Sequence, residues 1–366
     1  MEDRYYWSAL QTVPGLGNAR LNSLVAYFGS ARQAWQAPWR DLFLSACLEE
    51  DLCNKLVGQR EKIDVQKMAD AWESRGIGLV TTADEDYPAR LRGIFDPPAV
   101  LYFRGRLPQD DRLVAVVGAR RASVYGKNAA SLLAQGLAGA GFGVVSGAAR
   151  GIDSAAHEGA LAGKGYTVAV LGCGVDVVYP PENGRLLARI AEQGAVVSEY
   201  WPGTAPQAHF FPVRNRIISG LSLGVTVVEA AEKSGSLITA DLALEQGRDV
   251  FAVPGSIFAA GSRGAHRLLK QGAKLVESAA DILEEYGLPA AGRRAKRKPA
   301  IEGGDEGRVY AALSFDSALG VEELVMKVKL PLPVVTYILL QLELKGLVAE
   351  YGGRRFVRAP GREWVE

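Results

Sequence analysis

The stretch VAVVGARRASVYG, residues 114–126, decides the fold prediction. It begins with an apolar run that ends in glycine, as the first strand and turn of a nucleotide-binding α/β domain do. A dinucleotide site requires further glycines in this turn, but the chain has Arg120, Arg121 and Ser123 there. The stretch therefore predicts a Rossmann-like turn that binds something other than a dinucleotide.

The region around this stretch, residues 76–288, alternates short apolar runs with helical patterns. Strands are expected at 113–118, 142–147, 166–172, 195–199, 224–230, 249–253 and 273–276. Helices are expected at 126–140, 152–163, 183–193, 213–222, 236–246 and 263–271. The strand runs are continuously apolar, which is typical of a parallel sheet buried on both faces. We therefore predict a doubly wound, Rossmann-like α/β domain.

Two smaller domains and a linker flank this region. Residues 1–75 repeat apolar side chains at helical spacing, and their Pro-Gly-x-Gly turn (residues 14–17) indicates a helix-hairpin-helix-like module. That turn is either a phosphate contact or a tight connection between helices. Residues 289–304 are predicted to form a basic linker, which is either a solvated tether or a contact to nucleic-acid phosphates. Residues 305–366 have the order of a winged helix, three helices followed by a hairpin. The third helix carries one cation, Lys345, so we expect it to dock protein or serve structure instead of reading a major groove.

Composition excludes several classes of protein. A chain of 366 residues is too long for a single hydrophobic core, so two or three domains are expected. The formal charge of +1 is compatible with a local basic groove. Three cysteines without a CxxC pair and three scattered histidines predict neither a disulfide framework nor a metal site, and no cofactor is expected. No signal peptide and no apolar run of about 18 residues is found, which predicts a cytosolic protein without a membrane partner.

The loops at the carboxyl ends of the predicted strands share one chemistry. They offer small residues, N–H groups at helix starts, or a cation, as around Ser146 and Gly147 and around Lys233, Ser234 and Gly235. Several such loops at one sheet edge indicate a ligand with several phosphates. Arg120 presents a planar fork that suits a phosphodiester, and Phe211 is either a face for base stacking or part of the core.

Catalytic groups are poorly represented. No Ser/His/Asp order, metal constellation or Walker motif is found, and three carboxylates fall near the predicted edge, namely Asp153, Glu199 and Glu229. Capping of helices and pairing with arginines is favoured for them over acid–base chemistry. We therefore expect a binding protein and not an enzyme.

These motifs resemble the DNA-processing protein family DprA, also called Smf. The resemblance spans about residues 84–288 in unbroken order and is highly specific in RNRIISGLS (214–222) and SGSLITA (234–240). The terminal regions also resemble the family's sterile-alpha-motif-like module and winged helix. Membership implies a protein that binds single-stranded DNA, protects incoming strands during natural transformation and loads the recombinase RecA.

The resemblance also implies which residues act. The single-stranded DNA site would comprise Gly118, Arg120, Arg121, Ser123, Ser146, Gly147, Phe211, Arg214, Asn215, Lys233, Ser234 and Gly235. The family's homodimer surface corresponds to His266, Leu269 and Leu275, for which ordinary helix–sheet packing is the alternative. Relatives often have lysine where this chain has Ala208, which removes one cation from the expected groove.

Two other functions stay open at this stage. A nucleotide phosphoribohydrolase of the lysine-decarboxylase-like group has a related Rossmann core, but its PGGxGTxxE signature is replaced here by EKSGSLITA (232–240). A structural adaptor whose middle region binds no DNA is the third possibility.

Overall fold

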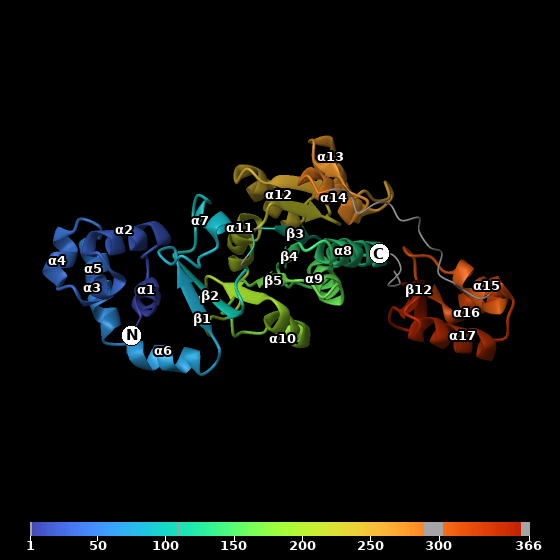
Figure 1. Cartoon of the computed structure of the whole chain (residues 1–366), viewed down its shortest axis with the longest axis horizontal. Coiled ribbons are helices and arrows are strands. Elements are labelled where there is room, and N and C mark those ends of the chain that lie inside the picture. Colours follow the sequence, from blue (N-terminus) through green and yellow to red (C-terminus); the bar gives the residue numbers. More distant parts are fainter. Residues whose placement is uncertain (1, 109, 111, 289–302, 360–366) are drawn as a thin grey trace.

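The computed structural model describes residues 2–108, 110, 112–288 and 303–359. Figure 1 shows the N-terminal helices and the C-terminal domain at opposite ends of a central sheet. Most of the predicted linker, with its cations at 293, 294 and 296–298, and the last residues of the predicted winged helix lie outside the described residues. No helix in the described ranges has both the length and the apolar character that crossing a bilayer requires.

The N-terminal part is helical, as predicted. Its helices are α1 (Asp3–Gln11), α2 (Asn18–Phe28), α3 (Ala31–Gln36), α4 (Trp39–Leu44), α5 (Glu50–Arg60) and α6 (Val65–Glu73). Gly15, at a φ of 92°, makes the turn before α2. The Asn18 side chain then bonds to the Asp96 carboxylate (3.1 Å) and to the Ala99 N–H (3.2 Å). This end of α2 therefore packs against the central domain.

A nine-stranded sheet forms the central domain, in the order β1-β2-β6-β5-β4-β3-β7-β8-β9. The strands are β1 (Gly78–Thr81), β2 (Val100–Gly105), β3 (Leu113–Val117), β4 (Gly143–Ser146), β5 (Thr167–Val170), β6 (Ala195–Ser198), β7 (Gly224–Val227), β8 (Asp249–Ala252) and β9 (Lys274–Leu275). Strands β3 to β9 pair in parallel, with Val114 opposite Gly224 and Leu113 opposite Gly143. The predicted doubly wound sheet is thus confirmed, whereas antiparallel β1 and β2 were not predicted.

Helices cover both faces of the parallel strands. They are α7 (Ala89–Arg92), α8 (Val124–Gly139), α9 (Ile152–Ala162), α10 (Gly184–Gln193), α11 (Phe210–Leu221), α12 (Gly235–Glu245), α13 (Arg263–Lys270) and α14 (Ala279–Glu285), with short 3-10 turns at Pro181–Asn183 and Ala260–Ser262. The predicted strands and helices agree with these bounds to within about three residues. Only α7, α14 and the 3-10 turns were missed, since these segments are too short to show a period.

The order of the strands fixes where a ligand would bind. From β3 the chain adds β4, β5 and β6 on one side, then returns to add β7 and β8 on the other. The loops after β3 and β7 consequently run in opposite directions, and a crevice opens between them at the carboxyl edge. All the predicted phosphate-binding loops lie along this edge.

The C-terminal domain has winged-helix order. Its elements are α15 (Asp305–Ala312), β10 (Leu319–Gly320), α16 (Val321–Val328), α17 (Leu332–Leu344), β11 (Val348–Glu350) and β12 (Arg355–Arg358). The predicted hairpin turns at Gly352 and Gly353, both at positive φ. The outer face of α17 exposes apolar side chains (Tyr337, Leu340 and Leu344), which fits the expected protein-docking or structural role.

His157 of α9 is a buried ionisable group behind the sheet edge. Its Nδ1 lies 2.8 Å from Thr167 Oγ1, whose hydroxyl donates to the Val144 carbonyl, so Nδ1 is the donor in the histidine contact. Burial lowers the pKa of His157 to about 3. The ring is therefore neutral in the folded protein at every pH above that value.

This shift predicts an acid-sensitive stability. The unfolded state gains a proton on His157 below about pH 6.5, whereas the folded state gains it only near pH 3, so stability falls as pH drops through 6.5. Between pH 7.5 and 5 the wild type should lose roughly 2 kcal/mol more unfolding free energy than His157→Gln. Urea unfolding at both pH values measures this, with His209→Gln, an exposed site, as the control. Parallel losses in wild type and His157→Gln would contradict the assignment.

Candidate nucleic-acid interface

A small cavity opens where the loops after β3, β4 and β5 meet the first turn of α11. Its volume is about 40 Å³, room for about three water molecules and hence for a phosphate-sized group. Three residues of the predicted site, Arg120, Gly147 and Phe211, line it together. Arg150 and Tyr179, which the prediction missed, complete its rim.

Phe211 forms one wall of this cavity. Its ring packs closely on Gly172, in the loop after β5: a Cβ atom added at Gly172 would lie only 2.9 Å from the Phe211 ring. The Tyr179 ring lies 5.5 Å away at 33°, and the Arg120 guanidinium carbon lies 5.2 Å from the Phe211 centroid. A half-buried aromatic ring beside an exposed guanidinium is the combination that stacks a base and binds its phosphate.

Arg214, which was predicted to contact DNA, lies behind the cavity instead of on its surface. Its side chain is only 4% exposed, and its guanidinium donates to the carbonyls of Gly147 (2.9 Å) and Val170. Burial lowers the pKa of Arg214 to about 10, so it stays positive at neutral pH. Arg214 thus ties the ends of β4 and β5 together and places a fixed positive charge behind the cavity.

Ser146, also a predicted DNA contact, is likewise internal. It is fully buried, and its hydroxyl donates to the Val116 carbonyl at 2.7 Å, linking β4 to β3. Gly147 follows it, and a Cβ there would lie 2.6 Å from Arg214 Nη2. Glycine is therefore required at 147 for the close approach of Arg214.

Asp153 lies beside Arg214 at the start of α9. Its carboxylate accepts the Ala149 N–H at 3.3 Å, and burial raises its pKa although the Arg214 charge opposes this. Of the capping and pairing roles favoured for the three carboxylates, pairing with an arginine is confirmed for Glu199. Asp153 binds the loop before α9, and Glu229 binds the start of α8.

Glu229 fills the position where a Rossmann turn usually holds a phosphate. It extends from the end of β7 to the start of α8, where its carboxylate accepts the Ser123 N–H (2.8 Å) and hydroxyl (3.2 Å). Cβ atoms on Gly126 and Gly261 would lie 2.2 and 2.6 Å from its oxygens, so two glycines make room for it. Because this carboxylate already satisfies the positive end of the helix, an anion is disfavoured there. The opening sequence stretch therefore cannot hold a pyrophosphate at α8.

The other predicted site residues are distributed along the same edge. Gly118 is a close-packing position, since a Cβ would lie 2.6 Å from Ile152. Arg121 and Lys233 are exposed, and Ser234 caps α12. Asn215 donates to the Gly235 carbonyl at 3.4 Å, which joins α11 to the loop after β7.

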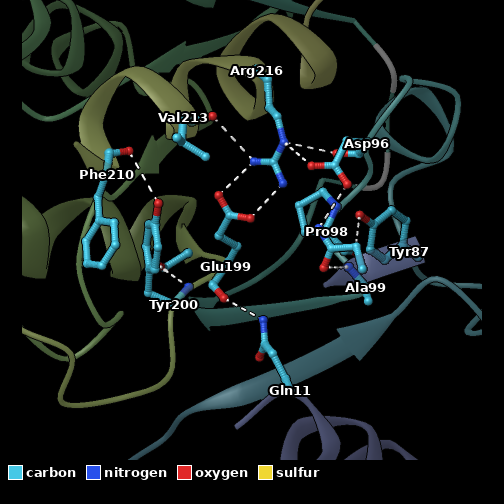
Figure 2. Close-up of polar contacts among 12 residues, drawn as sticks. Gln11, Tyr87, Asp96, Pro98, Ala99, Glu199, Tyr200, Phe210, Val213 and Arg216 are labelled. Atoms are coloured by element: carbon cyan, nitrogen blue, oxygen red, sulfur yellow. Dashed lines mark hydrogen bonds and ion pairs between the residues drawn. The ribbon is translucent and has the colours of Figure 1, made fainter. Parts of the chain in front are cut away.

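The second arginine of the RNR motif is structural. Arg216 forms a two-pronged pair with Glu199, at 2.7 and 2.6 Å, and also donates to the Asp96 carbonyl at 3.0 Å (Figure 2). Burial alone would lower its pKa, but the hydrogen bonds and charge of Glu199 raise it. The Glu199 carbonyl also accepts the Gln11 amide (Figure 2), so the network connects α11, the end of β6 and the N-terminal helices.

No group near the cavity is prepared for nucleophilic or metal chemistry in the part of the chain that the structure describes. Burial raises the pKa of Cys173 to about 11, which keeps its thiol protonated. Among the described residues no three His, Cys, Asp or Glu side chains gather where they could hold a metal ion.

The predicted dimer residues lie at the far end of the sheet. Leu275 is 48% exposed on the edge strand β9, and Leu269 of α13 is half-buried against the core. His266 donates to the Gly255 carbonyl at 3.1 Å. Leu275 is thus exposed and free to contact a second subunit. Leu269 instead packs partly against the core, as the alternative of ordinary helix–sheet packing expects.

Removing Glu199 should strongly destabilise the fold. Glu199→Ala leaves Arg216 charged and buried, which costs about 3–5 kcal/mol of unfolding free energy. Glu158→Ala breaks the half-exposed pair with Arg189 (2.7 Å) and should cost about 1 kcal/mol or less. Chemical denaturation of both variants measures the difference, and equal losses would show that the buried pair is not a main constraint.

Comparisons with known proteins agree with this geometry. Family models match the DNA recombination-mediator protein A family over residues 78–287 and the DprA winged helix domain over residues 293–354.

Protein Smf of Synechocystis is 33% identical over 97% of this chain and 99% of its own length. The DprA of Bacillus subtilis is 46% identical over 59% of this chain and 73% of its own.

Two solved structures are also similar. The DprA of Streptococcus pneumoniae aligns with a TM-score of 0.67 and 38% identity, over 77% of this chain and 97% of its own. The DprA of Helicobacter pylori, described with a single-stranded DNA binding mode, aligns with a TM-score of 0.52 and 31% identity. This alignment covers 57% of this chain and 95% of the Helicobacter pylori chain. With its parallel sheet, its edge cavity and its winged helix, this chain belongs to the DprA (Smf) family of DNA recombination-mediator proteins.

Proposed function

We propose that this chain binds single-stranded DNA at the cavity between Arg120 and Phe211. The observation that carries the proposal is the exposed guanidinium 5.2 Å from a half-buried aromatic ring at the carboxyl edge of the sheet. Arg120 would bind a phosphate while a base stacks on Phe211. The single-stranded DNA binding of the Helicobacter pylori relative supports the same ligand.

Each remaining part of the predicted site has a defined place in this proposal. Arg121 and Lys233 add exposed cations along the sheet edge, and the residues between them are Ser123, Asn215, Ser234 and Gly235. The residues that support the cavity from behind are Gly118, Ser146, Gly147 and Arg214. Ala208 lies three residues before Phe211 and supplies no cation. The strand would therefore depend mainly on the two arginines of the first turn.

We further propose that the protein protects incoming strands and loads RecA during natural transformation, as family membership implies. A homodimer through His266, Leu269 and Leu275 would place two cavities on one assembly. The phosphoribohydrolase alternative is less well supported, because Glu229 occupies the start of α8 where a nucleotide phosphate would bind. Release of base from adenosine monophosphate would test it.

Arg120→Ala should weaken binding of a labelled oligothymidine about tenfold or more, because a charge-assisted phosphate contact is lost. The slope of log affinity against log salt should also become shallower by about 0.7. Fluorescence anisotropy over a salt series measures both quantities, with duplex DNA of equal length as the competing ligand. Arg189→Ala, on α10 and paired with Glu158, is the matched control. Unchanged affinity and slope in Arg120→Ala would refute the proposal.

Leu275→Asp should convert a dimer to a monomer in solution. The side chain is 48% exposed on an edge strand, so a charge there leaves the fold intact but opposes pairing of two apolar surfaces. Light scattering gives the mass, and Leu44→Asp, at a 63% exposed leucine of α4, is the control. The same mass for Leu275→Asp and wild type would exclude this interface.

A further inference from the structure

The loop after β8 exposes two large apolar side chains that the proposed DNA site does not use. Phe258 is 92% exposed and Ile257 is 76% exposed. A phenylalanine or isoleucine left in water forgoes the stabilisation that burial of its side chain would give. Both residues follow β8 at the carboxyl edge of the sheet, the same edge as the proposed DNA site.

The backbone that carries these side chains is firmly held. The Tyr125 hydroxyl donates to the Pro254 carbonyl at 2.7 Å, and His266 donates to the Gly255 carbonyl at 3.1 Å. At the tip, the Phe258 N–H donates to the Ser256 hydroxyl at 3.2 Å. The base of the loop is thus held to α8 and α13, which lowers the backbone entropy lost when a ligand covers its tip.

The position of the loop connects it to the proposed DNA site. Gly261, in the same loop, lies against Glu229, whose carboxylate binds the turn that carries Arg120 and Arg121. Strands β5, β4, β3, β7 and β8 are consecutive neighbours in the sheet. At about 4.8 Å a step, the cavity at β5 and the loop after β8 are separated by roughly 19 Å along one edge.

The charges around the loop favour nucleic acid as its partner. Arg121 and Lys233 are exposed on the neighbouring loops, whereas Arg263, which begins the helix that follows, lies 3.9 Å from the Glu232 carboxylate. Two apolar side chains are far too small an area for a stable protein interface, which needs about 1,000 Å² or more. Apolar faces flanked by cations are instead the design of a single-strand binding track.

We propose that Ile257 and Phe258 form a second base-stacking platform for the DNA strand that leaves the Arg120–Phe211 cavity. This inference rests on the proposed single-stranded DNA binding. The strand would cross the sheet edge from β5 to β8, with its phosphates near Arg121 and Lys233 and its bases on Phe258.

The experiment uses oligothymidines of two lengths, about 4 and about 15 nucleotides, with the full chain and fluorescence anisotropy. Phe258→Ser should weaken binding of the long strand about tenfold and leave the short strand, held by the cavity alone, unchanged. Phe258→Trp should restore the long-strand affinity because it retains an aromatic face. Leu344→Ser, at a 74% exposed leucine on α17, controls for loss of an exposed apolar side chain.

Arg120→Ala, which should weaken both lengths, separates the two proposals. If it has no effect, the proposed cavity itself fails. If it acts but Phe258→Ser changes neither length, or changes both equally, the second platform is wrong. A lower mass of Phe258→Ser by light scattering would also overturn it, since the side chain would then contact a second copy of the chain.

Discussion

The buried pair of Arg216 and Glu199 is the constraint on which the site depends. Both charges are almost fully removed from water, a cost that only two short, parallel hydrogen bonds and a further bond to the Asp96 carbonyl can offset. The pair fixes α11 against the end of β6 and against the segment before β2. Through Gln11 it also anchors the N-terminal helices (Figure 2).

Once α11 is fixed, its sequence determines what faces the ligand. Phe211 and Arg214 are three residues apart and therefore lie on one face of the helix, whereas Arg216 points to another. The first face closes the cavity with an aromatic ring and a buried charge. A single motif thus provides both the anchor of the helix and the wall of the site, and a change at Arg216 would disturb Phe211 without touching it.

Two fixed charges decide where an anion is stable along the edge. Glu229 neutralises the positive end of α8, and the buried guanidinium of Arg214 lies one loop away behind the cavity. A phosphate is therefore favoured between β3 and β5 and disfavoured directly at the start of α8, where the pyrophosphate of a dinucleotide binds in related folds. The arginine in this Rossmann-like turn therefore does not bind a phosphate at the usual position, because the Glu229 carboxylate already occupies it.

The sequence predicts the parallel sheet well because continuous apolar runs and glycine turns are local signals. It also predicts Arg120 and Phe211, which line the cavity, because each lies in a local pattern: the turn after a strand and a loop motif. It does not distinguish the exposed Arg120 from the buried Arg214, since the carbonyl acceptors of Arg214 belong to β4 and β5, far away in the chain. Tyr179 and Arg150 were missed for the same reason: they join the site only because their strands are neighbours in the folded sheet.

The order of features along the edge gives the proposed track a direction. The cavity lies at β5, the exposed Phe258 follows at β8, and the open strand β9 carries Leu275. A two-fold axis at β9 would pair identical surfaces, so the two Phe258 side chains would lie between the two cavities. Along the resulting DNA track, the first cavity would be followed by the two Phe258 platforms and then by the second cavity, so that the platforms lie nearest the two-fold axis. In such an arrangement a strand long enough to reach the second cavity gains from both platforms, whereas a short strand gains from neither.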